Sequence, residues 1–323
     1  MRPSPETRRF IDGVNERMPP FTPDDSTLAG LRAAEAAGVS VITGPDVAEV
    51  RDLACPGPAG DIALRLYHPA PSGPPLPGIV FLHGGGWVAG NLDTHDHIAR
   101  LLADGTGAAV VAVDYRIAPE APFPAAPDDA SAALRWTAAN AAGLGVDPAL
   151  LAVAGDSAGG TLAAVAAREA RDAGGPDLVY QALIYPATDL TGYPPGPGCP
   201  YPSRTENGDG YFLTLDAIAW YTERYVPDPA ARRDPRASPL HAPDLAGLPP
   251  ALVLTADFDP LRDEGEAYAR ALAEAGVPAT TARINGGFHG MFGMGAFVSV
   301  GRQAEQVVVT ALRSAFAAAA PRD

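Results

Sequence analysis

The chain has 323 residues, of which 47% are hydrophobic and 19% charged, and its formal net charge is −15. This acidic balance argues against nucleic acid or an anionic membrane surface as a partner, because both attract basic patches. All basic residues are arginine, and a chain without lysine can form neither a Walker-type phosphate loop nor a Schiff base with pyridoxal phosphate.

Targeting and metal-binding signals are also missing from the sequence. The N-terminal stretch has no apolar segment of secretory-signal length, and no apolar run is long enough to span a membrane. We therefore expect a cytoplasmic protein without membrane insertion. The two cysteines, Cys55 and Cys199, lie among prolines and glycines without zinc spacing, so two unpaired loop thiols are favoured over a pair that bridges two cap segments. We expect neither a metal nor a cofactor.

The first third of the chain changes from helical to strand-like patterning. Residues 1–45 read as helices that are separate from the rest of the chain. Residues 47–53 and 62–68 alternate apolar and polar side chains, which is typical of antiparallel edge strands. Residues 78–83 and 108–114 are continuous apolar runs, as buried parallel strands are, and the segment between them has helical spacing.

Strands and helices then continue to alternate, which predicts a doubly wound parallel sheet. The alternation stops over 187–248, where a loop rich in proline and glycine precedes one helix near 214–226. A long interruption of this kind is usually a functional lid or cap. The remaining expected elements are helices at 125–142, 157–175, 262–275 and 296–318, and strands at 150–155, 178–186, 251–256 and 278–284.

Three consecutive glycines, Gly84 to Gly86, follow the first buried strand in the stretch HGGGW. Such glycines serve a tight turn, a phosphate cradle, or a backbone that must approach a reacting atom. The lack of lysine excludes the phosphate loop. A dinucleotide-binding oxidoreductase is excluded as well, because the third glycine of G-x-G-x-x-G would fall at Ala89.

A serine nucleophile is predicted at Ser157. It occupies the centre of a G-x-S-x-G motif at the point where a predicted strand meets a predicted helix, which is the context that the motif requires. A serine hydroxyl needs a neighbouring base to take its proton. In α/β hydrolases the acid and then the histidine follow the serine along the chain. His289, in a glycine-rich loop after the last strand, fits this order, whereas His241 comes too early.

The acid is expected in the loop after the strand at 251–256. Asp259 is favoured, since Asp257 ends the strand and Asp263 and Glu264 fall in the first turn of a helix, where acidic side chains suit the helix dipole. Its role would be to orient His289.

Three other histidines precede the serine. His95 and His97 resemble a metal-binding pair, but alternate helical residues point in different directions, so surface histidines are expected. His83 reads as an anchor of the glycine loop.

Several motifs together resemble the hormone-sensitive-lipase-like family (bacterial family IV) of α/β-hydrolase esterases. They are HGGGW at 83–87, GDSAGG at 155–160, DPLRDEG at 259–265 and FHG at 288–290, with framework segments at 114–129 and 234–240. The resemblance implies Ser157, Asp259 and His289 as the catalytic triad, in agreement with the order along the chain. It also favours Asp259 over Asp257.

The resemblance further implies the α/β-hydrolase fold, a mostly parallel, doubly wound eight-stranded sheet with a helical cap. It places the cap in residues 1–45 and 188–235, and the catalytic core in 46–187 and 236–323. It implies a serine carboxylesterase that hydrolyses short- to medium-chain esters through an acyl-enzyme. A small-molecule ester is thus the expected partner, and a homodimer is one expected state.

Backbone N–H groups of Gly84, Gly85 and Ala158 are expected to hold the oxyanion of the tetrahedral intermediate. Aromatic side chains near these motifs are candidates for the wall of the substrate pocket, although each is also a candidate for the core. These candidates are Trp87, Phe123, Tyr211, Phe212, Trp220 and Phe288.

Two other functions use the same scaffold. A deacetylase or amidase, or a tailoring hydrolase or cyclase of secondary metabolism, would need the same triad, so the sequence does not separate them from an esterase. An inactive ligand-binding homologue is disfavoured because His289 is present.

Overall fold

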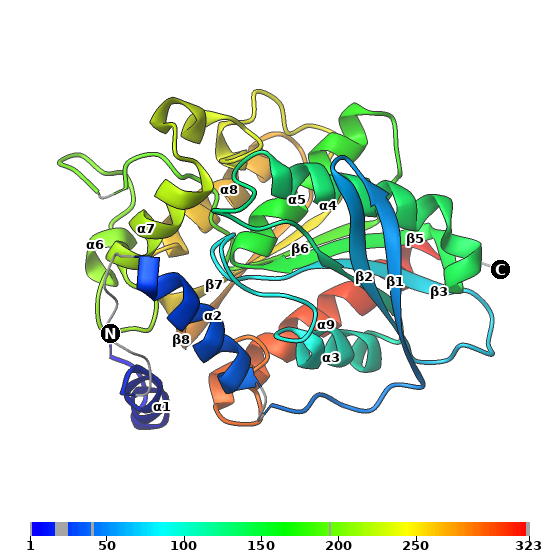
Figure 1. Ribbon diagram of the computed structural model, residues 1–323, viewed down its shortest axis with the longest axis horizontal. Helices are drawn as coiled ribbons and strands as arrows, with labels where there is room; N and C mark the ends of the chain where they lie inside the picture. The colour runs from blue at the N-terminus through cyan, green and yellow to red at the C-terminus, as the bar shows by residue number, and fades with distance from the viewer. Residues whose placement is uncertain (1, 17–24, 40–41, 194, 321–323) are drawn as a thin grey trace.

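The computed structural model describes residues 2–16, 25–39, 42–193 and 195–320 (Figure 1). Its centre is an eight-stranded sheet in the order β1-β2-β4-β3-β5-β6-β7-β8. The strands are β1 (Glu49–Gly57), β2 (Gly60–His68), β3 (Leu76–Leu82), β4 (Ala109–Asp114), β5 (Val146–Asp156), β6 (Tyr180–Ile184), β7 (Ala251–Phe258) and β8 (Ala279–Phe288).

Helices connect these strands and flank the sheet. The α-helices are α1 (Pro5–Asn15), α2 (Asp25–Val39), α3 (Asp96–Thr106), α4 (Ala125–Ala139), α5 (Ala158–Asp172), α6 (Ser203–Glu206), α7 (Leu215–Tyr225), α8 (Arg262–Glu274) and α9 (Ser299–Ala319). Short 3₁₀ helices lie at η1 (Ala141–Leu144), η2 (Pro229–Arg233) and η3 (Pro239–His241). In the described part of the chain, no helix is long and apolar enough to cross a membrane.

The sheet is antiparallel at one edge and parallel elsewhere. β1 pairs with β2 and β2 with β4 in antiparallel register, and all other neighbours are parallel. The predicted antiparallel strands and the predicted parallel core are thereby confirmed, although only β1 lies at the edge, since β2 pairs on both sides. Parallel strands are buried on both faces, which explains their continuous apolar runs. Along β3, for example, Ile79 and Phe81 face one helical layer, and Val80 and Leu82 face the other.

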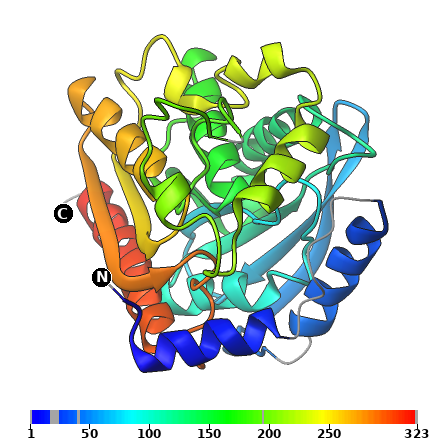
Figure 2. The same ribbon diagram turned by 90° about the vertical axis from the view of Figure 1, so that its left-hand side faces the viewer.

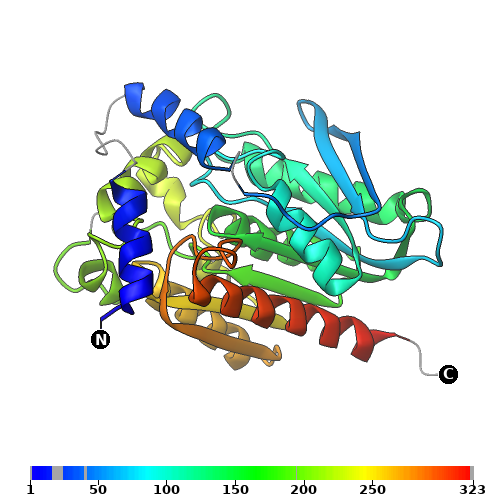
Figure 3. The same cartoon turned by 90° about the horizontal axis from the view of Figure 1, so that it is seen from below.

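Two helical layers cover the sheet. α3 and α9 lie side by side on one face (Figure 3), with Ile11 of α1 packed into the same apolar cluster. α4, α5 and α8 supply the cluster on the opposite face. The sequence had suggested that this segment is separate from the rest of the chain. For α1 this is wrong, because its one fully buried apolar side chain, Ile11, belongs to the core.

The remaining helices gather where the parallel strands end. α1, α2, α6 and α7 lie around this end of the sheet in Figure 1, and Figure 2 looks directly onto them. α6 and α7 belong to the long insertion between β6 and β7. Residues 1, 17–24 and 40–41 of the N-terminal segment lie outside the described part. Open α/β sheets bind ligands at the carboxyl ends of their strands, so this is the end at which a site is expected.

Some predicted boundaries were wrong. β5 begins at Val146 rather than near residue 150, and β8 continues to Phe288 rather than ending near residue 284. β8 includes residues with low strand propensity, and its register with β7 shifts between Ala256 and Phe258. Cys55 lies in β1 with no exposed surface, not in a loop, although both cysteines are unpaired as expected.

Candidate active site

Ser157 lies on a sharp turn between β5 and α5. Its backbone has φ 55° and ψ −120°, a left-handed conformation that is uncommon for a residue with a side chain. Gly155 and Gly159 make the turn sterically feasible, since a Cβ on Gly155 would overlap the carbonyl of Gly159 and one on Gly159 would overlap the carbonyl of Leu82. The turn therefore presents the Ser157 hydroxyl at the carboxyl end of the sheet.

His289 and Asp259 are brought to this serine from separate strands. His289 directly follows β8 and Asp259 directly follows β7. The distance from His289 Nε2 to Ser157 Oγ is 2.9 Å, and that from His289 Nδ1 to Asp259 Oδ2 is 2.8 Å. Because a carboxylate only accepts, Nδ1–H donates to Asp259 and leaves Nε2 free to accept the serine proton. Asp259 is fully buried and His289 is 5% exposed.

The other acidic residues considered for this role have different partners. Asp257 accepts a hydrogen bond from the Gly286 amide at 2.7 Å and so joins β7 to the end of β8. Glu264 forms a buried ion pair with Arg204, with 2.7 Å between Arg204 Nη2 and Glu264 Oε2. It is thus not merely a helix-dipole residue, as its place in the first turn of α8 had suggested. Only Asp259 of this set lies against the His289 ring.

The glycine loop lies against the serine turn, but its first amide is already engaged. Gly84 N–H donates to Asp156 Oδ1 at 3.0 Å, which argues against its predicted role as an oxyanion donor. Among the described residues, no hydrogen-bond partner is found for the amides of Gly85 and Gly86. Together with the amide of Ala158, which directly follows Ser157 at the start of α5, they are therefore the candidates for oxyanion donors.

His83 anchors this glycine loop through hydrogen bonds of its ring and of its backbone carbonyl. Its Nδ1 lies 2.7 Å from the Gly84 carbonyl oxygen, and its own carbonyl accepts a 2.7 Å hydrogen bond from the Tyr115 hydroxyl. The rings of His83 and Tyr115 stack with 4.2 Å between centroids. Burial lowers the pKa of His83 to about 3, so the ring is neutral at physiological pH. This neutral state suits an anchor of the loop.

His95 and His97 are not surface histidines, contrary to expectation. His97 is 4% exposed, and burial lowers its pKa to about 4. His95 Nε2 lies 3.7 Å from Asp156 Oδ1. Within the described residues, no group of three or more such side chains is placed to hold a metal ion. His97 lies on the buried side of α3, together with Ile98 and Leu102, and His95 is the residue directly before this helix.

Asp156 links these histidines to the glycine loop. Burial alone would raise the pKa of this carboxyl group, but His95, His83 and the Gly84 amide hold its pKa below the ordinary value. It is therefore a buried carboxylate directly beside the predicted nucleophile in sequence.

The predicted pocket aromatics fall into two groups. Trp87, Trp220 and Phe288 are at most 3% exposed; Trp87 stacks on Tyr225 with 4.5 Å between centroids, and Phe288 packs against Phe10. These three are core residues. The others are more exposed and lie as follows: Phe212 is 39% exposed beside Gly290, Tyr211 stacks on Phe258, and the half-buried Phe123 meets Tyr225 edge-on.

Tyr221 of α7 was missed by the sequence analysis. A Cβ on Gly86 would lie 2.6 Å from the Tyr221 ring, so this ring covers the glycine loop. No sequence signal distinguishes Tyr221 from its neighbour Trp220, since only the rotation of α7 decides which of the two faces the loop. Tyr221 and Phe212 thus bring the insertion over opposite parts of the site, the glycine loop and the His289 loop.

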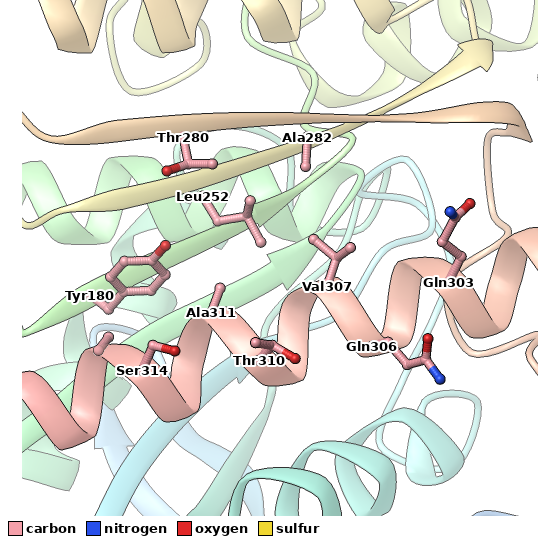
Figure 4. A pocket seen from close by; sticks show the side chains of 11 residues that line it. Tyr180, Leu252, Thr280, Ala282, Gln303, Gln306, Val307, Thr310, Ala311 and Ser314 are labelled. Atoms are coloured by element: carbon pink, nitrogen blue, oxygen red, sulfur yellow. The ribbon is translucent and has the colours of Figure 1, made fainter.

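A separate hollow of about 650 Å³ lies between α9 and the starts of β6, β7 and β8 (Figure 4). Side chains of α9, including Val307, Ala311 and Ser314, point toward the strands there. None of the predicted site residues lines it. It lies at the amino ends of the parallel strands, away from Ser157.

Comparisons with known proteins agree with this geometry. Residues 79–293 match a family described as having the alpha/beta hydrolase fold. Esterase LipI of Mycobacterium tuberculosis is 44% identical over 82% of this chain and 81% of its own length. The ethyl acetate hydrolase of Pseudomonas putida is 42% identical over 78% of each chain. The structure of a hyperthermophilic esterase from Pyrobaculum calidifontis superposes with a TM-score of 0.89 at 42% identity, covering 99% of this chain and 100% of that one.

Proposed function

Because this chain belongs to the α/β-hydrolase family, and within it to the hormone-sensitive-lipase-like esterases, we propose that it hydrolyses carboxylic esters through an acyl-enzyme on Ser157. That it is a carboxylic ester hydrolase follows from its relatives. The assignment of roles rests above all on one observation, the continuous chain of hydrogen bonds from Ser157 Oγ through the His289 ring to Asp259.

In the proposed reaction, Ser157 Oγ attacks the ester carbonyl carbon while its proton moves to His289 Nε2. Asp259 orients the ring and stabilises the imidazolium. His289 then gives the proton to the leaving alcohol oxygen as the carbon–oxygen bond breaks. Water attacks the acyl-enzyme in the second half, with the proton again passing through His289, which releases the acid and restores Ser157.

The developing oxyanion needs preorganised donors. We assign this role to the backbone amides of Ala158, Gly85 and Gly86. Gly84, which the sequence had suggested, is left out because its N–H donates a hydrogen bond to Asp156. Each such donor typically contributes about 10²- to 10³-fold in rate.

The substrate proposal is a small-molecule ester with a short to medium acyl chain. Phe212 and Tyr221 are the aromatic side chains that best support a pocket wall, since both lie against loops of the site. We further propose that residues 1–45 and 188–235 form the cap over a core of 46–187 and 236–323. A homodimer and a cytoplasmic location stay predictions; sedimentation would test the first.

Substitution of the nucleophile tests the proposal. Ser157→Ala should remove nearly all hydrolysis of a p-nitrophenyl ester and all labelling by a fluorophosphonate, because the reacting oxygen is gone. Ser299→Ala, on an exposed serine, is the matched control and should behave as wild type. Near-wild-type hydrolysis by Ser157→Ala would refute the assignment. A panel of esters, amides and lactones would separate the esterase from the amidase and cyclase alternatives.

A further inference from the structure

The loop that carries Asp259 is held from outside by one short segment of the insertion. Ser203, Arg204 and Asn207, at α6, all bond to residues 257–264, and we call these three residues the acid-loop clamp. Ser203 Oγ donates to the Pro260 carbonyl at 2.8 Å. The bonded residues are 50 to 60 positions apart in the sequence, so these contacts exist only in the fold.

Asn207 is the member of the clamp nearest to the proposed catalytic acid. Its side-chain nitrogen Nδ2 donates to the carbonyl oxygen of Asp257 at 3.0 Å and to that of Asp259 at 3.3 Å. Both neighbours are acceptors, so only the NH₂ end of the amide can satisfy them. The side chain is buried, with the residue only 5% exposed.

These two carbonyls lie at the end of β7, where its pairing with the neighbouring strands stops or becomes irregular. β7 pairs with β6 only as far as Leu254, and its register with β8 is irregular between Ala256 and Phe258. A backbone that leaves a sheet in this way needs other partners for its buried polar groups. Asn207 supplies one such partner on each side of Phe258. Arg262 also donates to both carbonyls, with its Nη1 to that of Asp257 at 3.1 Å and with its backbone amide to that of Asp259 at 3.2 Å.

The carboxylate of Asp259 takes its direction from this backbone. Its Oδ1 accepts from the Leu261 amide at 2.8 Å, within its own loop, while Oδ2 faces His289. A displacement of the loop would therefore carry the carboxylate with it. We infer that Asn207 is a positioning residue for the triad, one that holds Asp259 in register with His289 by fixing the main chain around it. The inference rests on the role proposed above for Asp259.

The rest of the clamp keeps Asn207 in place. The backbone N–H of Asn207 donates to the Ser203 carbonyl oxygen at 3.0 Å. The backbone N–H of Ser203 donates to Asp263 Oδ2 at 2.7 Å. Arg204, which is 1% exposed, lies between the rings of Tyr193 and Tyr201 while it pairs with Glu264. The clamp thus also bonds to Pro260, Asp263 and Glu264, which follow the two carbonyls that Asn207 contacts.

Kinetics of Asn207→Ala test the inference. Small misplacements of catalytic groups are costly, so kcat should fall about tenfold while KM stays within about twofold. Thr205→Ala is the matched control, because this exposed residue of α6 bonds only within its own turn, and it should keep wild-type kcat. Asn207→Asp, which keeps the shape but loses both donors, should resemble Asn207→Ala.

A double-mutant cycle separates positioning from general damage. In an Asp259→Asn background the acid no longer needs placing, so adding Asn207→Ala should change the residual kcat less than about twofold. The same tenfold loss in both backgrounds would overturn the inference, as would wild-type kcat in Asn207→Ala. If Asn207→Ala does not fold, Asn207→Ser, which retains one donor, allows the same comparison. Near-wild-type activity of Asp259→Asn alone would instead refute the proposed function.

Discussion

At the scale of single residues, the site depends on one strained serine and one buried carboxylate. The φ of 55° at Ser157 is a conformation that typically costs roughly 1–3 kcal/mol for a residue with a side chain. The neighbouring Asp156 has no place in the proposed proton path, yet it is buried and bonded to the glycine loop. A buried charge is retained only with good partners, and here they are Gly84 and His95.

Removal of the Asp156 carboxylate should therefore slow catalysis without removing a reacting group. Asp156→Ala leaves the Gly84 amide without its acceptor, so we expect the glycine loop to shift and kcat to fall about tenfold or more, since oxyanion donors act only at the correct distance. Steady-state kinetics with a p-nitrophenyl ester would measure this. Asp93→Asn, whose side chain is 82% exposed, is the control. A kcat within twofold of wild type in Asp156→Ala would contradict the account.

At the scale of elements, the insertion between β6 and β7 is joined to α8 by a buried ion pair. Arg204 and Glu264 are at most 1% exposed, and Glu264 also accepts hydrogen bonds from the Thr188 amide and the Tyr193 hydroxyl. A nearby pair, Arg262 with Glu206, has a similar geometry at 3.0 Å but a glutamate that is 56% exposed. Burial of both charges makes the first pair costly to break and the second nearly neutral.

This contrast predicts the effects of two equivalent substitutions. Glu264→Gln should lower the free energy of unfolding by about 3 kcal/mol or more, because it leaves the Arg204 charge buried without its counter-ion. Glu206→Gln should lower it by less than about 1 kcal/mol. Urea unfolding monitored by circular dichroism would give both values. Equal losses from the two variants would show that burial does not determine the strength of these pairs.

At the scale of the whole molecule, the buried neutral histidines make the fold sensitive to acid. The folded pKa is lowered to about 3 for His83 and about 4 for His97, whereas the ordinary value is 6.5. Below pH 6.5 the unfolded chain thus binds protons that the folded chain does not. The contribution of these neutral histidines to the free energy of unfolding is fully present above pH 6.5. It is lost as the pH falls toward their pKa values in the folded protein. The lowered pKa of Asp156 acts in the same direction at lower pH.

Replacement of one buried histidine should weaken this pH dependence. Between pH 7 and pH 5 the unfolding free energy of the wild type should fall, and in His97→Leu the fall should be smaller by about 1–2 kcal/mol, the contribution of one such group. Urea unfolding at the two pH values measures the difference. An unchanged difference in His97→Leu would mean that His97 is protonated in the folded protein.

The order of the elements and the residues that meet at the site were predictable because they depend on local patterns. Continuous apolar runs indicated strands that are buried on both faces, and the alternation of apolar and polar side chains indicated the antiparallel strands near the edge. The strand-turn-helix context of Ser157, and the order of acid and histidine after it, were sufficient to select Asp259 and His289. Each of these signals lies within about twenty residues of chain, or follows from chain order alone.

What the sequence by itself determined is thus the family, the fold and the candidates for each chemical role. Only the tertiary structure decided that the Gly84 amide donates to Asp156, that His97 is buried, that Tyr221 rather than Trp220 covers the glycine loop, and that Asn207 bonds to the Asp259 loop. These contacts join segments tens of residues apart. Their geometry follows from how helices rotate and dock against the sheet, which no local pattern of side chains encodes.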